Sequence, residues 1–373
     1  MLTYTELVTL ERSLRETLVL SVYLDGTADD FAEQRAWRTM LEHSLKDLRT
    51  WLADSSHAER ELFERCVAYL EKELTPLSHG VGSRGWVAFI TGDGVRHTGS
   101  LPVPMPTMAV WSTGPSVAPY IRALKQTRPV IVAVADARKA TLYRYHQGAL
   151  ERIHTIHARA VAGPAAHMGD APRIGFHPGV RGTTGSDAAQ RSFLAGTNRM
   201  YKKVADEAVK LAGADGWILT GGIPHSSADL VQLMAHSAPG RVAAIDSLDI
   251  HASEAEIASA AEQGASALRD ASDLHKIEDI IARANGDDLV ALGPVAARDA
   301  LDQSRVRELY LTHSFIEGHG ADAEDVVRKA LAQGALVEEV SREAAERLEA
   351  SGGMAARLRY RRPASAIVSS QPY

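Results

Sequence analysis

Pro129 is followed directly by the run Val130-Ile-Val-Ala-Val-Ala135, in which all six side chains are apolar and four are β-branched. Such a run predicts a strand buried on both faces of a sheet. Thr141-Leu-Tyr-Arg-Tyr145 follows as an expected hairpin partner. Two further strands and two helices are expected over 217–220, 242–245, 186–212 and 228–236. Strands that alternate with helices predict an α/β domain, which we place at 126–250.

Upstream of this domain the sequence predicts a mixed α+β N-terminal domain over 1–125. Leu18-Val-Leu-Ser-Val-Tyr-Leu24 is typical of a buried strand, and Thr91-Gly-Asp-Gly94 is typical of a hairpin turn between two strands. An amphipathic helix is predicted between these features by apolar residues that recur every three or four positions, namely Trp37, Leu41, Leu45, Leu48 and Leu52. The first boundary is expected near 126, after a stretch rich in proline.

Downstream, the sequence from 253 to 284 is helical in pattern, and short strand and helix signals alternate after it. We therefore expect a C-terminal α/β/α sandwich over 251–373. The fold class is α/β with three domains, which suits a chain of 373 residues.

Composition limits the possible functions. Hydrophobic residues make up 45% and no window has the apolar length of a membrane span, so we expect no membrane partner. The net charge of −6 argues against binding nucleic acid by overall basicity, and no DNA partner is expected. The first residues have no secretory pattern and the single cysteine, Cys66, has no internal partner, so a cytoplasmic location is expected.

The segment from 158 to 190 is rich in Gly, Ala, Pro, His and Thr and shows no periodicity, which predicts a long functional loop. It ends in Arg181-Gly-Thr-Thr-Gly-Ser-Asp187, directly before the predicted helix. A glycine-rich run at a helix N-terminus offers free backbone N–H groups to an anion. A capping box formed by Thr184 and Asp187 explains the same residues without any ligand.

The helix after this loop is basic along one face. Arg191, Arg199, Lys202 and Lys203 fall on one side, while Phe193, Met200 and Val204 fall on the other. Six Lys or Arg residues between Arg173 and Lys203 are opposed by the single Asp187. The loop and helix therefore suit a phosphate backbone, although a solvated basic face would have the same pattern.

Several short motifs, in the same order along the chain, resemble the class-1 peptide release factors of archaea and eukaryotes and their rescue relative Pelota. Arg181-Gly182-Thr183-Thr184 stands where that superfamily has Arg-Gly-Gly-Gln, and Lys203-Val-Ala-Asp206 stands where it has Lys-Val-Ala-Glu. Gly352-Gly-Met-Ala-Ala-Arg-Leu-Arg-Tyr360 is similar to the family's Gly-Gly-Ile-x-x-Ile-Leu-Arg-Tyr ending. The segment Leu289–Leu301 resembles the start of the family's third domain. The segment Leu20–Asp25 is similar to the first core strand of the N-terminal domain in bacterial relatives.

This resemblance implies a ribosome-associated translation factor that enters the A site. The N-terminal domain would lie near the decoding centre and the middle loop would point towards the peptidyl-transferase centre. The loop residues implied are Arg181, Gly182, Thr183, Thr184, Gly185, Ser186 and Asp187. Phosphates of rRNA or P-site tRNA would be held by the cations Arg173, Arg191, Arg199, Lys202 and Lys203.

The chain departs from the family at the residues that carry out the family's chemistry. Thr183 and Thr184 replace the second glycine and the glutamine, and threonine restricts positive φ and lacks a carboxamide. Gln190 is a weak catalytic candidate, as is Thr184. We therefore expect ribosome hibernation or rescue, as in Balon-like factors, without efficient peptidyl-tRNA hydrolysis. The alternatives are a peptidyl-tRNA hydrolase with an altered loop and a non-ribosomal α/β enzyme that binds a phosphorylated ligand.

The C-terminal arginines are a second candidate surface. Arg357, Arg359, Arg361 and Arg362 occur with no acidic residue after Glu349. By the same resemblance they would contact rRNA, EF-Tu or another translational GTPase. A charged edge strand that faces water accounts for them equally well.

No metal or cofactor is expected. The histidines at 154, 157, 167 and 177 lack a tight ligand spacing, and no glycine-rich fingerprint of a phosphate cofactor follows a strand.

Overall fold

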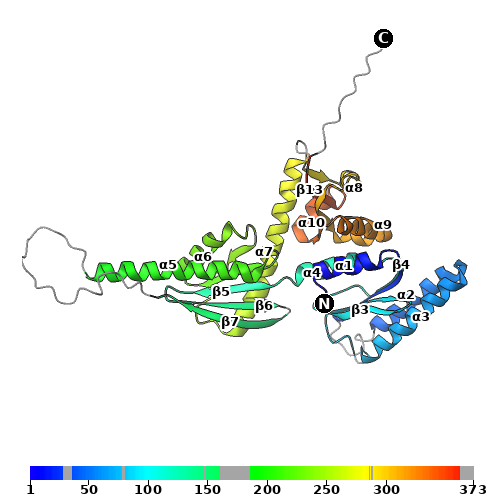
Figure 1. Ribbon diagram of the computed structural model, residues 1–373, viewed down its shortest axis with the longest axis horizontal. Helices are drawn as coiled ribbons and strands as arrows, with labels where there is room; N and C mark the ends of the chain where they lie inside the picture. The colour runs from blue at the N-terminus through cyan, green and yellow to red at the C-terminus, as the bar shows by residue number, and fades with distance from the viewer. Residues whose placement is uncertain are drawn as a thin grey trace, which may run out of the picture. The chain divides into compact units, whose positions relative to one another are not determined.

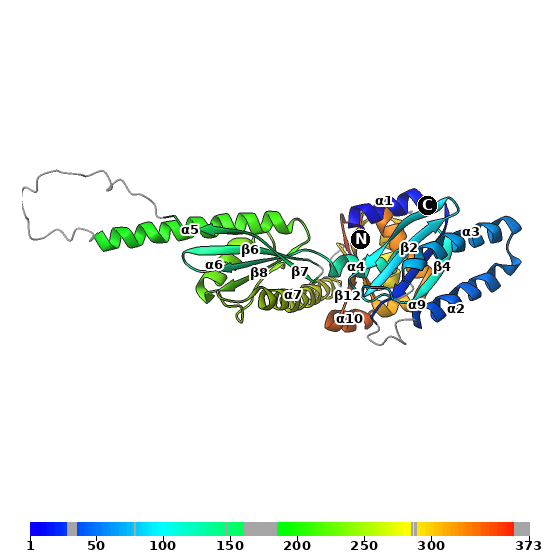
Figure 2. The same cartoon turned by 90° about the horizontal axis from the view of Figure 1, so that it is seen from below.

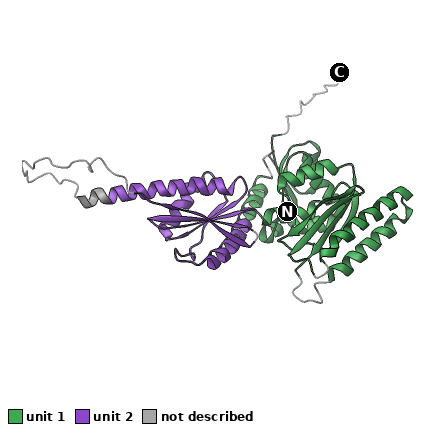
Figure 3. Cartoon of the chain, turned by 60° about the horizontal axis from the view of Figure 1, so that its bottom comes forward, with its two compact units in different colours: residues 1–127, 273–373 green, residues 128–272 purple. Residues whose placement is uncertain are grey.

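The computed structural model describes residues 1–27, 36–77, 80–146, 148–159, 185–284, 286 and 289–361, and for 185–189 it describes the backbone alone. The chain forms two compact units (Figure 3). The first unit combines Met1–Thr127 with Asp273–Tyr373, and the second is Arg128–Ser272.

The N-terminal part of the first unit is built on a four-stranded antiparallel sheet of order β3-β2-β1-β4. Its strands are β1 (Leu18–Asp25), β2 (Gly85–Thr91), β3 (Gly94–Leu101) and β4 (Met108–Thr113). Its helices are α1 (Tyr4–Leu14), α2 (Ala36–Trp51), α3 (His57–Leu74) and α4 (Ala118–Gln126), with short 3-10 turns η2 (Leu52–Asp54) and η3 (Thr75–Leu77). β1 is buried on both faces because Leu20 and Val22 pack beneath α2 and α3 while Val19 and Tyr23 face the opposite side. The predicted strand, amphipathic helix and hairpin are confirmed.

The C-terminal part of the same unit has a four-stranded sheet of order β10-β13-β11-β12, in which only β11 and β12 pair in parallel. The strands are β10 (Val290–Leu292), β11 (Val306–Thr312), β12 (Leu336–Val340) and β13 (Met354–Leu358). The helices are α8 (Pro294–Asp302), α9 (His313–Ala332) and α10 (Arg342–Glu349). α8 and α9 pack on one face, and α10 packs on the other together with the second half of α7 (Glu254–Arg283). The expected α/β/α sandwich is therefore confirmed.

One hydrophobic cluster joins these two sheets. It contains Tyr23 and Phe89 of the N-terminal sheet together with Leu309, Phe315 and Val326 of the C-terminal sheet and its helix α9. Segments that are far apart in the sequence therefore share one core within the first unit.

The second unit is built on a five-stranded sheet of order β7-β6-β5-β8-β9 (Figures 1 and 2). Its strands are β5 (Val130–Ala135), β6 (Lys139–His146), β7 (Ala149–His157), β8 (Trp217–Gly222) and β9 (Val242–Ala244). β5, β8 and β9 run parallel, and β6 and β7 complete an antiparallel hairpin. α5 (Gly185–Ala212) and α6 (Pro224–Ala235) cover one face. The run 130–135 is fully buried, as its composition predicts.

The first half of α7 covers the other face of this sheet through Ile257, Ala261 and Ala265. The sequence placed the whole of this helix in a domain that begins at 251, whereas the second unit continues to Ser272. The difference arises because one continuous helix of 30 residues packs its two halves on different sheets. The α/β fold class is confirmed, with one sheet in each of the three expected segments.

Candidate functional site

α5 carries most of the predicted site residues that the structure describes. The helix has 28 residues and begins at Gly185. Gly185, Ser186 and Asp187 form its first turn, but their side chains are outside the described part. Arg173, Arg181, Gly182, Thr183 and Thr184 lie entirely outside the described residues. The anion-binding loop and its capping alternative therefore remain predictions.

One face of α5 is held firmly against its own sheet. Met200 and Val204 are buried in the cluster between α5 and β5. Thr197 donates from Oγ1 to the carbonyl oxygen of Ala137 at 2.8 Å, and the Tyr201 hydroxyl donates to Ser226 Oγ at 2.5 Å. Burial raises the pKa of the Tyr201 phenol, so this hydroxyl stays protonated as a donor. These contacts fix the rotation of the helix about its axis.

The opposite face of α5 is exposed and basic. Arg191, Arg199, Lys202 and Lys203 are all exposed, as the helical spacing predicts. Arg199, Lys202 and Lys203 have no acidic partner among the described residues. Lys203 lies 12 positions after Arg191, so the four cations span about 18 Å along the axis at 1.5 Å per residue. The structure therefore brings these four predicted residues together on one surface.

The first described side chains of α5 are not packed. Phe193 was predicted on the buried face, yet it is 37% exposed and Leu194 is 51% exposed. Burial begins at Gly196 because the N-terminal turns of the helix extend past the end of the sheet (Figure 2). Gln190, the weak catalytic candidate, is exposed in the same extension. The described N-terminal part of α5 thus presents both cations and apolar side chains.

The C-terminal arginines are largely engaged within the protein. Arg357 forms ion pairs with Asp279 at 2.8 Å and with Glu308 at 3.8 Å. Arg359 donates from Nη2 to the carbonyl oxygen of Gln333 at 2.7 Å. Arg361 is exposed, and Arg362 lies outside the described residues. Contact of this surface with rRNA or a GTPase stays a prediction, for which Arg359 and Arg361 are both exposed.

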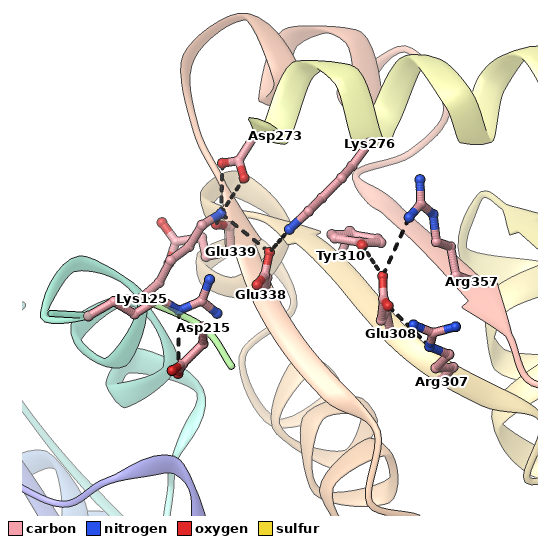
Figure 4. Close-up of polar contacts among 11 residues, drawn as sticks. Lys125, Asp215, Asp273, Lys276, Arg307, Glu308, Tyr310, Glu338, Glu339 and Arg357 are labelled. Carbon is pink, nitrogen blue, oxygen red and sulfur yellow. Dashed lines mark hydrogen bonds and ion pairs between the residues drawn. The ribbon is translucent and has the colours of Figure 1, made fainter. Parts of the chain in front are cut away.

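A buried charge cluster was missed in the sequence. Lys125 and Asp273 are 7% and 1% exposed, and Glu338 is 1% exposed in β12 (Figure 4). The sequence feature that could have indicated this cluster is the pair of acidic residues in the strand pattern Leu336-Val-Glu-Glu-Val340. A buried strand is expected to carry apolar side chains on both faces. Adjacent carboxylates in a buried strand imply cationic partners elsewhere in the fold.

The described residues contain no cluster of three or more His, Cys, Asp or Glu side chains arranged to hold a metal ion. His154, for example, pairs with Glu207 at 3.5 Å. No helix within the described part of the chain combines the length and apolar character required to cross a membrane.

The middle of the chain matches a known protein family. Residues 115–266 match the family model of bacterial archaeo-eukaryotic release factor family 10. This region contains all of β5–β9, α5 and α6. The middle of the chain is therefore similar to this release-factor family, and the match includes the whole basic face of α5.

Comparison with solved structures finds translation factors. The chain is similar to Pelota of Archaeoglobus fulgidus, with 15% identity over 74% of this chain and 79% of that chain and a TM-score of 0.34. It is similar to the archaeal translation termination factor aRF1, with 17% identity over 96% and 99% of the two chains and a TM-score of 0.26. It is also similar to Dom34 of S. cerevisiae, with 12% identity over 75% of this chain and 82% of that chain and a TM-score of 0.44. No curated protein sequence matches the chain.

Proposed function

We propose that this protein binds the A site of the ribosome through the basic face of α5, as a hibernation or rescue factor. The observation that carries the proposal is the row of exposed cations, Arg191, Arg199, Lys202 and Lys203, within a segment that matches a release-factor family. A net charge of −6 makes this local concentration of positive charge the feature that suits an RNA backbone. A translation factor of this family would present such a face to rRNA or tRNA.

Efficient hydrolysis of peptidyl-tRNA is not part of the proposed function. Thr183 and Thr184 occupy the positions of the family's second glycine and glutamine. A threonine hydroxyl lacks the paired donor and acceptor of a carboxamide, which would orient an attacking water. Gln190 is exposed on α5, within the helix and six positions after Thr184, and we do not propose that it replaces the glutamine.

We also propose a partner GTPase, because solved structures similar to this chain belong to proteins with translation partners. Yeast Dom34 interacts with Hbs1, and an archaeal Pelota has been described bound to the ribosome with ABCE1. For this chain, EF-Tu or another translational GTPase would approach the C-terminal sheet near Arg361.

Ribosome binding is tested by sedimentation with purified ribosomes. The triple variant Arg199→Glu, Lys202→Glu, Lys203→Glu should lose co-sedimentation. The matched control Arg199→Lys, Lys202→Arg, Lys203→Arg preserves the charge and should retain it. For the wild type, the logarithm of the affinity should fall with the logarithm of salt concentration, with a slope of about 0.7–0.9 per phosphate contact. Undiminished binding of the reversed variant, with its helical content intact, would contradict the proposal.

Hydrolysis is tested on ribosomes that carry peptidyl-tRNA. We expect no release above the uncatalysed rate for the wild type or for Gln190→Ala. Rapid release by the wild type that Gln190→Ala abolishes would establish the hydrolase alternative instead.

A further inference from the structure

Arg305 is a buried arginine directly before β11, in the C-terminal part of the first unit. The residue is 7% exposed, and none of the described residues forms a hydrogen bond or ion pair with its guanidinium group. Six other charged side chains are buried in the described part of the chain, and each of them has a polar partner: Glu11, Lys125, Asp273, Glu324, Glu338 and Glu339. Arg305 is thus a buried cation without a counter-ion among the described residues.

The local fold does not require arginine at this position. α8 ends in a Schellman turn, in which the N–H groups of Ser304 and Arg305 each donate to a carbonyl oxygen of the helix at 2.9 Å. α9 ends in the same turn before the neighbouring strand β12, with Gly334 and Ala335 in the equivalent places. Such a turn favours glycine followed by an apolar residue. An apolar side chain at position 305 would therefore complete the turn without a buried charge.

The C-terminus of α8 does not account for the buried charge. The partial negative charge at the end of a helix stabilises a nearby cation only weakly, by less than the removal of a guanidinium group from water costs. Asp302, the last residue of α8, pairs with Lys329 at 3.4 Å. Arg305 is therefore retained at a cost in stability, which an anionic ligand would offset.

Three segments surround Arg305 (Figure 1). Arg359 follows β13, and its N–H donates to the carbonyl oxygen of Arg305 at 2.8 Å, while its Nη2 donates to the carbonyl oxygen of Gln333 at 2.7 Å. Gln333, at the end of α9, donates from Nε2 to the carbonyl oxygen of Leu301 in α8 at 2.6 Å. The ends of β13, α8 and α9 thus meet at one corner of the C-terminal sheet. We call Arg305, Gln333 and Arg359 the Arg305 corner.

The Arg305 corner contains two polar atoms that are sealed from solvent and have no partner among the described residues. Arg305 Nε is a donor, and Gln333 Oε1 is an acceptor. The two Nη atoms of Arg305 also have no partner there, but they are not sealed from solvent, so the forked end of the guanidinium group reaches the surface. Arg359 and Arg361 are exposed beside it and add positive charge.

We propose that the Arg305 corner is a binding site for a phosphate group. A planar guanidinium group pairs with two phosphate oxygens through parallel N–H···O bonds. Hydrogen phosphate also carries a hydroxyl group that can donate to Gln333 Oε1, whereas a carboxylate has no such donor. The site goes beyond the proposed function, because it uses no residue of α5 and stands whether or not that helix binds RNA.

Thermal unfolding of the full chain tests the site, in inorganic phosphate and in sodium chloride of equal ionic strength. A ligand that binds only the folded state raises the melting temperature as its concentration rises. The wild type should therefore melt at a higher temperature in phosphate. Arg305→Met removes the unpaired charge, so in chloride it should melt at a higher temperature than the wild type. Its apparent affinity for phosphate should fall by at least about tenfold, because charge-assisted hydrogen bonds are lost.

Two further variants separate the fork from the charge. Arg305→Lys keeps the charge without the planar fork and should also bind phosphate more weakly than the wild type. Arg347→Met is the matched control, because it removes the same charge from an exposed pair with Glu343 in α10. This control should keep the phosphate response of the wild type. An equal phosphate response in the wild type and Arg305→Met, or a lower melting temperature of Arg305→Met in chloride, would overturn the inference.

A parallel titration with adenosine monophosphate distinguishes the source of the phosphate group. Tyr360 is 49% exposed next to Arg359, and its hydroxyl donates to the carbonyl oxygen of Gln303 at 3.3 Å. An exposed aromatic ring at this place can stack on a base. Tighter binding of the nucleotide than of inorganic phosphate would identify a nucleotide as the source, and equal binding would identify free phosphate.

Discussion

Glu324 illustrates how single residues join distant parts of the chain. It belongs to α9, is 7% exposed and accepts hydrogen bonds at the start of α4. The donors are Val117 N at 2.8 Å, Ala118 N at 3.1 Å and Ser116 Oγ at 3.0 Å. The N-cap residue of α4, Val117, has no side-chain acceptor of its own, so the cap is supplied from a segment about 200 residues away.

Glu324→Ala should lower the free energy of unfolding of the first unit by about 3 kcal/mol, because buried donors at the α4 N-terminus lose their acceptor. Glu324→Gln keeps one carbonyl acceptor and should cost less. Urea denaturation followed by tryptophan fluorescence measures both. Equal stability of the alanine variant and the wild type would show that water replaces the carboxylate.

His313 should make stability depend on pH. Its Nδ1 lies 3.4 Å from Glu339 Oε1, and this hydrogen bond raises the pKa of His313 above 6.5. The pair therefore contributes its full stability below about pH 6.5 and loses it as the pH rises through the folded-state pKa. His313→Asn should lose up to about 1 kcal/mol at roughly pH 6 and almost nothing at roughly pH 9. A pH-independent difference in urea denaturation would contradict this assignment.

At the scale of elements, the junction of β8 and α6 is a turn that requires glycine at position 222. Gly222 has a φ of 100° and donates from its N–H to the carbonyl oxygen of Leu248 at 2.6 Å. A Cβ atom at this position would lie 2.2 Å from the carbonyl oxygen of Ala135. The parallel strands β5 and β8 can therefore end together only with glycine here.

Gly222→Ala should destabilise the second unit by about 3 kcal/mol or more, since it combines backbone strain with a backbone clash. Gly240→Ala is the matched control, because Gly240 has a φ of 67° with nothing within 4 Å of the added Cβ. Gly240→Ala should lower the free energy of unfolding by only about 1 kcal/mol, from backbone strain alone. Thermal denaturation compares the two, and similar melting temperatures would show that the strands move apart at little cost.

At the scale of the whole molecule, α7 decides where the second unit ends. Val132 and Trp217 on the outer face of the five-stranded sheet are covered by Ile257 and Ala261 of this helix. A chain that ends before Glu254 would expose that face to water.

A fragment of residues 128–272 should fold cooperatively on its own, with a dispersed amide NMR spectrum. The shorter fragment 128–250 should lack a fixed core and bind hydrophobic dyes, because the first half of α7 is missing. A well-folded 128–250 fragment would show that α7 is dispensable for this core.

Local pattern predicted most of the elements. The strand 130–135, the hairpin around Gly92 and Gly94, and the long helix after 185 follow from apolar periodicity and turn residues, which act over a few positions. The basic face of α5 was predicted in the same way, since helical spacing alone brings Arg199, Lys202 and Lys203 together. Phe193 was misplaced because periodicity indicates which face of a helix is apolar but not where the supporting sheet ends.

The sequence by itself determined the α/β class and the cationic face of α5, whereas the replacement of the family's glycine and glutamine by Thr183 and Thr184 stays a prediction from resemblance. These depend on residue identity and on short-range geometry. Only the tertiary structure decided that α7 packs on two sheets, that Glu324 caps α4, and that Lys125 pairs with the buried Asp273. The physical reason is that buried polar groups select partners by three-dimensional proximity, which separation along the chain does not encode.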